Sequence, residues 1–339
     1  MSEDNTLLDT IERALRRLAE ADADASAGWR EAEALGLPLA LVPEPAGGFG
    51  AQGVTAARIF GLLGANPPMA PLAESIMAAL IVSRAGADTP AGPLTLAAGA
   101  KGDLADRRFS GLLRGVAALP GGYDVVARLP DGPPMILSSA HGQTVEGRNL
   151  AGERRDTLQF NNAPARVLGG SDPLTPFDYG ALARAGQTAG ALRTVLNMTV
   201  EQLRTRQQFG RALGSFQALQ QMAAVLAAET NLLETAAQSG FAALAALDDP
   251  RFEIGALKLR ANQAALRASA ISHQLHGAMG FTLEHPLHRL TLRLVSWAGE
   301  FGNEQHWAPR LADMAFAAGA DGFWDRLIGY DALLEGAAG

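Results

Sequence analysis

The order of helical and strand-like segments restricts the fold more than any other feature of this sequence. Residues 1–86 and the chain from Pro176 onward carry apolar side chains every three or four positions, which is typical of amphipathic helices. Between residues 90 and 172, proline and glycine become more frequent and turn signals separate short apolar runs, which indicates strands. Helices therefore precede and follow the strands without alternating with them. This order argues against a doubly wound α/β fold and predicts an α+β protein that is mostly α.

Three domains are expected from these changes along the chain. The first, over residues 1–88, is helical, and Leu7, Ile11 and Leu15 share one face of its first helix. The second, over residues 89–173, is a small β domain. The third, over residues 174–339, is expected to be a four-helix bundle, because its helical segments are long, weakly charged and joined by short links. Further helices are expected at residues 29–37, 51–65, 71–86 and 255–278, and strands at residues 124–129, 134–137 and 157–160.

The charge balance excludes several classes of protein and site. The 339-residue chain has a formal net charge of −7, so it lacks the overall basic character that binding to nucleic acid or an anionic membrane requires. It contains no cysteine, which excludes disulfides, thiolate catalysis and cysteine-ligated metal. The longest apolar runs are far shorter than the ~20 residues that cross a bilayer, and the acidic first residues do not resemble a targeting signal. A cytoplasmic protein is expected.

Two motifs in the carboxyl-terminal half carry the strongest functional signal. The first reads RQQFG at residues 206–210 and continues as SFQALQ at residues 215–220, and the second reads QLHGAMGFTLEHPL at residues 274–287. They resemble the acyl-CoA dehydrogenase family, which combines an R-x-x-F-G…F-Q-x-x-Q segment with a later Q-x-x-G-G-x-G-[FY]-x-x-E-x-P segment. The run PEPAGGFG at residues 43–50 resembles the amino-terminal entry of the same family, so the resemblance extends from about residue 30 to about residue 310.

The resemblance implies the family's fold, FAD as the cofactor and an acyl-CoA thioester as the substrate. In the family, the neighbouring subunit contacts the adenosine diphosphate half of the FAD, and a different subunit cradles the flavin ring. By resemblance, Arg206 contacts the pyrophosphate through charge-assisted hydrogen bonds, and Phe209 stacks on the adenine. Gln217, Gln274 and Gly277 take the other adenosine-side positions.

Each of these residues also has a purely structural interpretation. Arg206 is then a cation at the carboxyl terminus of a helix, Phe209 a core aromatic, and Gly277 a C-cap that ends a helix. Ala278 replaces the family's second glycine, which adds a methyl group near the expected cofactor.

Two histidine pairs form another candidate site. They are His273/His276 and His285/His288, with Glu284 beside them, and this set superficially suggests a metal site. A pair with H-x-x-H spacing is a weak signal, however, and the family resemblance accounts for the whole segment. No bound metal is therefore expected.

The family's catalytic base is absent from its usual position. Dehydrogenation needs a base that removes the α proton while the flavin accepts the β hydride, and most members place a glutamate for this in an E-G-T-x-x-x-Q loop. The register from Gly280 and Phe281 puts Phe301 at that glutamate. Asn303 stands where a threonine contacts the flavin, and Gln305 follows as a further cofactor-side candidate.

Other positions that the family uses around its own flavin are also changed. A minority of members carries the base at the start of the helix with the R-x-x-F-G motif, and that position corresponds to Gly180. The family's E-P-x-A-G-S-D stretch has no match, and GVAA at residues 115–118 stands in place of W-[IV]-[TS]-N. The sequence thus keeps the residues that reach a neighbour's cofactor and lacks those that hold its own.

Three hypotheses follow for the function. In the first, the chain resembles the shorter subunit of the two-chain acyl-CoA dehydrogenases, which form heterotetramers and act on bulky substrates such as steroid-derived CoA thioesters. In the second, it is a self-sufficient dehydrogenase in which a shifted Glu300 is the base, with a pKa raised by an apolar site. In the third, it is a binding or scaffolding module without redox chemistry. Association with a related chain or another copy is expected in each, and the aromatic tail after residue 320 is expected to cover a groove or an interface.

Overall fold

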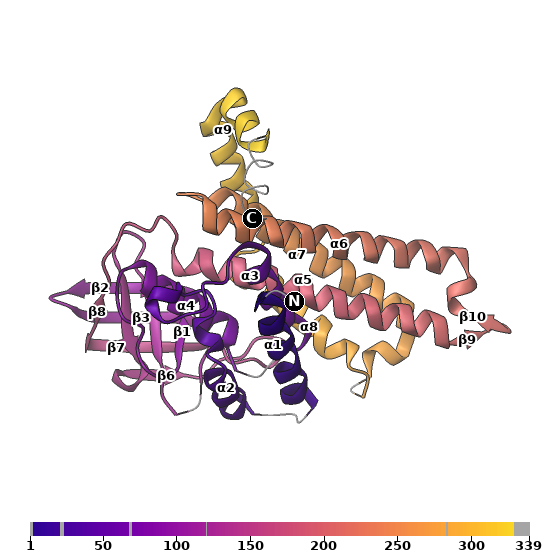
Figure 1. Cartoon of the computed structure of the whole chain (residues 1–339), viewed down its shortest axis with the longest axis horizontal. Helices are drawn as coiled ribbons and strands as arrows, with labels where there is room; N and C mark the ends of the chain where they lie inside the picture. The colour runs from indigo at the N-terminus through magenta and orange to yellow at the C-terminus, as the bar shows by residue number, and fades with distance from the viewer. Residues whose placement is uncertain (1–2, 21–23, 68–69, 120, 283, 329–339) are drawn as a thin grey trace.

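The chain folds into helices at both ends and strands in the middle, as its segment order predicts. The computed structural model describes residues 3–20, 24–67, 70–119, 121–282 and 284–328. The strands gather on one side of the amino-terminal helices, and long carboxyl-terminal helices extend the other way (Figure 1). The α+β, mostly α architecture is confirmed.

The amino-terminal part consists mainly of four α-helices. They are α1 (Glu3–Glu20), α2 (Ala25–Ala34), α3 (Gly53–Ala65) and α4 (Leu72–Arg84). The expectation for a helix over residues 29–37 is wrong at both ends. The helix begins earlier because the side chain of Asp24 caps it by accepting a hydrogen bond from the Ala27 N–H at 2.7 Å. It ends before Gly36, whose φ of 68° leaves the helical region.

The middle of the chain forms two four-stranded sheets. One has the strand order β1-β4-β5-β8 and the other β2-β3-β7-β6, with β1 and β4 as the parallel pair. The sequence predicted strands near β4, β5 and β7. It missed β1 and β8, which are only three and two residues long, and β2, β3 and β6, which are largely exposed or interrupted by glycine and lack a clear apolar alternation. The strands are β1 (Leu94–Leu96), β2 (Gly99–Ala105), β3 (Arg108–Val116), β4 (Asp124–Arg128), β5 (Pro134–Ser138), β6 (Gly142–Val145), β7 (Asp156–Pro164) and β8 (Arg166–Val167).

The carboxyl-terminal part is built from long helices. They are α5 (Pro176–Thr205), α6 (Gln217–Ala246), α7 (Arg251–His276), α8 (Leu287–Gly299) and α9 (Glu304–Ile328). Helix α5 begins with a capping box in which Thr175 and Asp178 each bind the other's backbone. Helix α7 starts four residues before the expected position and ends at His276. Among the described residues, every helix is too short or too polar to cross a membrane.

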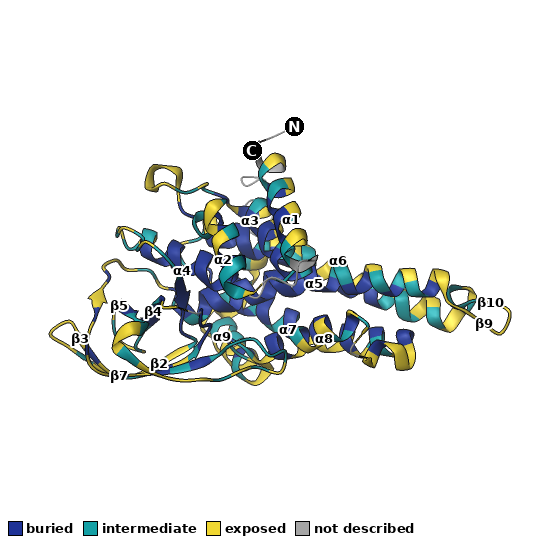
Figure 2. Cartoon of the chain, turned by 90° about the horizontal axis from the view of Figure 1, so that it is seen from below, coloured by how far each residue is buried: buried dark blue, intermediate teal, exposed yellow. Residues whose placement is uncertain are grey.

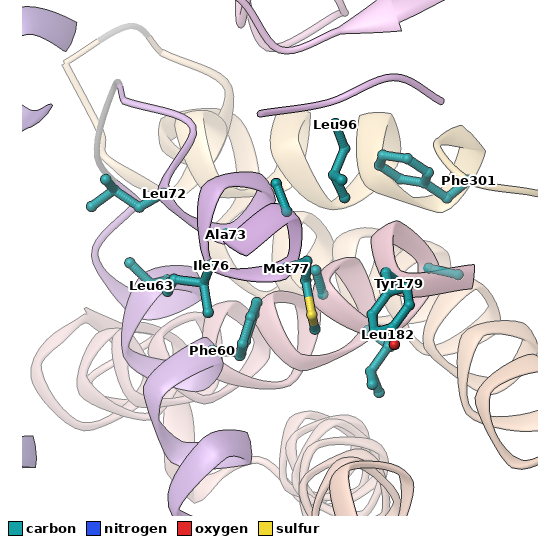
Figure 3. Close-up of a cluster of buried hydrophobic side chains, with 14 of the residues drawn as sticks. Phe60, Leu63, Leu72, Ala73, Ile76, Met77, Leu96, Tyr179, Leu182 and Phe301 are labelled. Atoms are coloured by element: carbon teal, nitrogen blue, oxygen red, sulfur yellow. The ribbon is translucent and has the colours of Figure 1, made fainter. Parts of the chain in front are cut away.

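Helix α5 lies at the centre of the molecule. Its first half is almost entirely buried, whereas the far end of the bundle, near β9 (Gln207–Gln208) and β10 (Arg211–Ala212), is exposed (Figure 2). It approaches α3 closely because glycines form the contact: a Cβ added at Gly190 would lie 1.8 Å from the carbonyl oxygen of Gly61. Phe60 of α3, Met77 of α4 and Tyr179 of α5 belong to one apolar cluster (Figure 3).

Candidate functional site

The first motif places its arginine and phenylalanine at the far tip of the bundle (Figure 1). Arg206 is the C-cap of α5. The chain then turns back through a short hairpin, in which β9 (Gln207–Gln208) pairs with β10 (Arg211–Ala212). Phe209 lies at the turn with a φ of 54° and an exposed fraction of 90%. A non-glycine residue in this backbone region costs about 1–3 kcal/mol. The exposure excludes core packing within this chain, and the positive φ of Phe209, followed by that of Gly210, suits the tight turn between the two strands.

The second motif forms an open groove beside this hairpin. Helix α7 ends at Gly277, whose φ of 62° suits the glycine, and a 3₁₀ turn follows over Gly277–Phe281. A Cβ added at Gly277 would have no neighbouring atom within 4 Å, so a ligand has access to the backbone there. The groove is lined by Ser269, Ala270, His273, Gln274, Gly277, Ala278 and Phe281.

The two motifs meet at this end of the chain. The Arg206 guanidinium Nη1 lies 3.7 Å from the Met279 sulfur, which joins the end of α5 to the turn after α7. Gln217, at the first position of α6, and Gln274, in the last turn of α7, are both exposed. This end therefore offers a guanidinium, two amides, an open glycine backbone and an aromatic face. Such a set fits the diphosphate and adenine of a dinucleotide cofactor.

The histidines next to the groove are engaged with protein groups. His273 Nε2 lies 2.8 Å from Thr291 Oγ1, and its ring stacks on Phe281 with centroids 4.2 Å apart. The rings of His276 and His285 meet edge to face at 5.0 Å. Within the described part of the chain, no group of three or more His, Cys, Asp or Glu side chains is arranged to hold a metal ion.

Phe301 lies at the opposite end of the bundle, in the link between α8 and α9. Its side chain is buried, and it joins the apolar cluster near Leu96 and Tyr179 (Figure 3). A Cβ added at Gly180 would lie 2.2 Å from the Phe301 ring, so the ring rests directly on the α5 backbone. The two positions where the family places its base are therefore in contact with each other here. An aromatic ring fills the space between them.

Glu300 points away from Phe301 and is held by basic side chains. It accepts hydrogen bonds from Arg155 Nε at 2.9 Å, Arg184 Nε at 2.8 Å and Asn149 Nδ2 at 2.8 Å. Burial alone would raise the pKa of Glu300, but the charges of Arg184 and Arg155 outweigh it and lower that pKa to about 2. The carboxylate is therefore ionised and strongly paired.

Glu300 belongs to a larger buried ion-pair network of three arginines and three glutamates. Arg184, which is only 2% exposed, also pairs with Glu74 from α4. Glu153 accepts from Arg155 at 2.9 Å and Arg293 at 3.0 Å. The charges balance, as buried ions require. The network joins Glu74, Glu153, Arg155, Arg184, Arg293 and Glu300 from both helical parts and the loop between β6 and β7.

This network fills part of the space between the strands and the helices. A cavity of about 30 Å³ is lined there by Glu74, Arg155, Arg184, Ala117 and Ala118. That volume suffices for about one or two water molecules, so this cavity is far smaller than a three-ring isoalloxazine. Ala117 and Ala118 supply neither an aromatic ring nor a hydroxyl group to it.

The sequence analysis missed the network, although a signal was present. Glu74 stands in the otherwise apolar helix Leu72–Arg84, and Arg184 interrupts an alanine-rich stretch of α5. A charged side chain in a helix that is buried on all sides requires a partner of opposite charge. The pattern therefore predicts that a buried ion pair exists, but it does not identify which charges meet.

The loop that carries Phe301 is fixed by buried polar contacts. Lys258 Nζ donates to the Trp297 carbonyl oxygen at 3.0 Å, and Asn262 Nδ2 donates to the Gly302 carbonyl oxygen at 3.0 Å. Burial lowers the pKa of Lys258 to about 7, an effect that the charge of Arg184 reinforces. These contacts hold the loop backbone at both sides of the phenylalanine.

Asn303 and Gln305 are both exposed, at the start of α9. Asn303 Oδ1 accepts a hydrogen bond from the His306 N–H at 3.1 Å, so the asparagine caps this helix. Within one chain, these residues lie far from the groove. Asn262 contacts the Phe301 loop, and Gln274 lies twelve residues further along α7, which corresponds to about 18 Å at 1.5 Å per residue. The structure thus separates the candidate residues into two groups.

Comparison with known proteins gives consistent matches. The family model for the carboxyl-terminal domain of acyl-CoA dehydrogenase matches residues 169–306. Among curated proteins, acyl-CoA dehydrogenase IpdE2 of Mycobacterium tuberculosis is 29% identical over 266 residues, which are 77% of each chain.

Among solved structures, a variant of the Tcur3481–Tcur3483 steroid ACAD aligns with a TM-score of 0.83 at 22% identity and covers 94% of this chain and 99% of its own. The ChsE4–ChsE5 complex from M. tuberculosis aligns with a TM-score of 0.81 at 21% identity, with 94% and 99% coverage. At these identities the structural matches show a shared fold.

Proposed function

We propose that this chain, which is similar to acyl-CoA dehydrogenases over most of its length, is the non-catalytic subunit of a two-chain enzyme. It contributes adenosine-side contacts to FAD seated in a second, related chain. That second chain supplies the base and the pocket for the flavin ring. The assembled enzyme oxidises the α,β bond of an acyl-CoA thioester.

One observation supports the proposal: buried ion pairs occupy the region beside Phe301, which the sequence register assigns to the base, while Arg206, Phe209 and Gln274 are exposed. The cavity next to these ion pairs measures about 30 Å³. Phe301 occupies the base position, and a phenyl ring accepts no proton. A chain with this arrangement can serve a cofactor held elsewhere, and it offers no base beside Phe301 for a flavin of its own.

Each exposed residue near the groove has a role in the proposed binding of FAD. Arg206 is exposed and its guanidinium has donors left for a pyrophosphate oxygen. Phe209 is 90% exposed and meets the Phe216 ring edge to face, so that a face of its ring remains open to stack on an adenine. Gln217, Gln274 and the open backbone at Gly277 complete the contacts. When bound, the flavin accepts the hydride, and this chain aligns and anchors the cofactor.

The substrate class is proposed from the structural neighbours. The Tcur3481–Tcur3483 protein is described as a steroid ACAD, and the resemblance to shorter subunits of two-chain dehydrogenases points the same way. We therefore assign a bulky, steroid-type CoA thioester to the assembled enzyme.

The geometry disfavours the second hypothesis, in which Glu300 is the base. A general base near neutral pH needs a pKa close to 7, whereas two arginines lower the pKa of Glu300 to about 2. The Glu300 carboxylate oxygens already accept four hydrogen bonds, of which Arg155 donates two and Arg184 and Asn149 donate one each. A carboxylate in this state is a poor proton acceptor.

The test is the FAD content of the complex with a full-length dehydrogenase encoded beside this gene. In that complex, Arg206→Ala with Phe209→Ala should lower FAD occupancy at least ~10-fold, because an ionic and a stacking contact are both lost. Arg114→Ala, which removes an exposed arginine from β3, is the control and should leave occupancy unchanged. Unchanged FAD binding in the double variant would refute the assignment. A complex that assembles without any flavin would favour the scaffolding hypothesis.

A further inference from the structure

A pocket between four helices lies apart from the two sites described above. Helix α1 lies beside α3 (Figure 2), and Leu8, Ile11 and Leu15 are each 2% exposed, so one face of α1 is packed into the core. Beside this face, α1, α3, α5 and α6 border a pocket of about 360 Å³, which we call the α1 pocket. It shares no lining residue with the groove near the hairpin or with the cavity beside the ion-pair network.

Small side chains create the space for this pocket. Its lining includes Gly61 and Ala65 of α3, Ala189 and Gly190 of α5, and Ala237 of α6. A Cβ added at Gly190 would lie 1.8 Å from the Gly61 carbonyl oxygen, so the backbones of α3 and α5 are already in contact. The two helices therefore cannot move closer together to fill the space beside that contact, and the pocket is a fixed feature of the helix packing.

The lining of the α1 pocket suits an apolar molecule of limited size. Leu8 and Leu62 add larger apolar side chains to the small residues. Small-molecule sites are typically clefts of ~300–1,000 Å³ with mostly apolar walls and a few polar groups, and in bundles they lie between helices. The 360 Å³ of this pocket equals the volume of about twelve water molecules at ~30 Å³ each. An apolar body of about a dozen non-hydrogen atoms therefore fits.

The charged side chains of the α1 pocket include more acids than bases. Arg193 donates hydrogen bonds to both carboxylate oxygens of Glu234, with its Nε at 2.8 Å, so these two charges compensate each other in the wall of the pocket. One negative charge remains in excess, because three acids and two arginines line the pocket. These charged residues are Asp9, Glu12, Arg58, Arg193 and Glu234.

Asp9 is the acid of the pocket that can meet a ligand directly. Glu12 is paired with Arg16 at 2.6 Å. Within the described ranges of the chain, the Asp9 carboxylate has no ion-pair partner, and its exposure places it where the pocket opens to solvent. A carboxylate in this position attracts a cation and repels an anion.

We propose that the α1 pocket binds a small apolar amine. The apolar body lies on the alanines and glycines of the pocket, and the ammonium group donates a charge-assisted hydrogen bond to the Asp9 carboxylate. An alkyl amine is positively charged at neutral pH, as the lysine side chain is with its pKa of about 10.4. The bound molecule contacts α1 and the bundle helices together, so it also ties the first helix to the rest of the chain. This inference does not depend on the proposed role in FAD binding.

The experiment compares three probes that share one apolar body and differ in charge. Phenylbutylamine, phenylbutanol and phenylbutyrate are titrated into the full chain at pH 7, and binding is followed by isothermal calorimetry and saturation-transfer NMR. The amine should bind with a Kd of about 1 mM or tighter, and at least ~10-fold more tightly than the alcohol, because only the amine forms a charged contact with Asp9. The carboxylate should bind more weakly than the alcohol, because Asp9 repels it.

Two variants with matched controls locate the binding site. Asp9→Asn should weaken binding of the amine at least ~10-fold and leave binding of the alcohol unchanged, whereas Asp103→Asn, at an exposed strand residue, should change neither. Ala65→Phe should abolish binding of both probes by filling the pocket, whereas Ala223→Phe, at a half-buried alanine of α6 outside the pocket, should not. Circular dichroism checks that each variant is folded, and Asp9→Asn, at an exposed residue, remains decisive if a phenylalanine variant is not.

Several results would overturn the proposal. They are an absence of amine binding, equal binding of the three probes, unchanged amine binding by Asp9→Asn or by folded Ala65→Phe, and an equal loss of binding in the controls. The titrations use the chain without FAD or a second chain, so their outcome is separate from the test of the proposed function.

Discussion

Replacing Glu300 by glutamine removes the charge at the centre of the buried ion-pair network while keeping the shape of the side chain. The carboxylate accepts hydrogen bonds from Arg155 and Arg184, and Arg184 is 2% exposed. In the variant, Arg184 loses its ion pair with residue 300 and keeps the ion pair with Glu74. Removing one member of a buried ion pair typically costs about 3–5 kcal/mol, because the remaining charge stays buried with less compensation.

The pKa of Glu300 gives a second measure of the same effect. It falls from 4.5 to about 2 in the folded chain. Each tenfold change in proton affinity is worth about 1.4 kcal/mol, so the ionised form contributes about 3 kcal/mol. We therefore expect Glu300→Gln to lower the free energy of unfolding by about 3–5 kcal/mol at pH 7.

The pH dependence has a definite sign. Because folding lowers the pKa of Glu300, its contribution is fully present above pH 4.5 and is lost as pH falls toward 2. The gap in unfolding free energy between wild type and Glu300→Gln should therefore narrow between pH 5 and pH 3. The Gln variant has no proton to gain at this position.

Urea denaturation followed by circular dichroism measures this gap. Glu12→Gln is the control: Glu12 pairs with Arg16 at the surface, and such a pair is worth about 0–1 kcal/mol. If Glu300→Gln proves as stable as the wild type or more stable, and abolishes turnover of the chain by itself, then Glu300 is a catalytic base and our interpretation of the network is wrong.

Three further changes test particular contacts. Gly180→Ala should destabilise the fold by about 1–3 kcal/mol, because its Cβ would lie 2.2 Å from the Phe301 ring. Adding Phe301→Leu should restore part of this loss. If the effects of the two changes on the unfolding free energy simply add in a double-mutant cycle, the contact is excluded. Lys258→Met should remove a pH effect: since folding lowers the pKa of Lys258 from 10.5 to about 7, the wild type should gain stability relative to this variant as pH rises from 7 toward 10. Lys101→Met, at an exposed lysine, should show no such change. Phe209→Ala should alter the unfolding free energy by less than about 0.5 kcal/mol, since the ring is 90% exposed; a larger loss would make this residue structural.

The overall architecture could be predicted because it depends on local periodicity. The stripes of apolar residues in α5, α6 and α7 are dictated by the 3.6-residue repeat of a helix that faces a core. The strands β4, β5 and β7 carry apolar residues because they also face the core, with the two-residue alternation of a strand. The strands β2 and β6 could not be found this way, since their exposed residues carry no such pattern and their pairing with β3 and β7 fixes them.

The candidate site could be predicted only in part. The residues proposed for the adenosine side lie in two short motifs, and the structure brings Arg206 of the first motif to 3.7 Å from the sulfur of Met279 in the second. The contact between Phe301 and Gly180 joins positions 121 residues apart, and periodicity contains no information about it. The same holds for Glu300, whose partners Arg155 and Arg184 come from a loop and a different helix. Its pKa follows from those partners and not from its neighbours in sequence.

The flavin content of the chain by itself tests the central claim most directly. The purified chain is titrated with FAD and followed by flavin fluorescence and by isothermal calorimetry, then mixed with the related full-length dehydrogenase and an acyl-CoA thioester. We expect no tight FAD binding and no flavin reduction by the chain alone, and one tightly bound FAD per catalytic chain in the complex. Stoichiometric FAD in the isolated chain, bleached by the thioester, would contradict the account, because the account places the flavin ring and the base in the partner chain, whereas buried ion pairs and Phe301 occupy the corresponding region here.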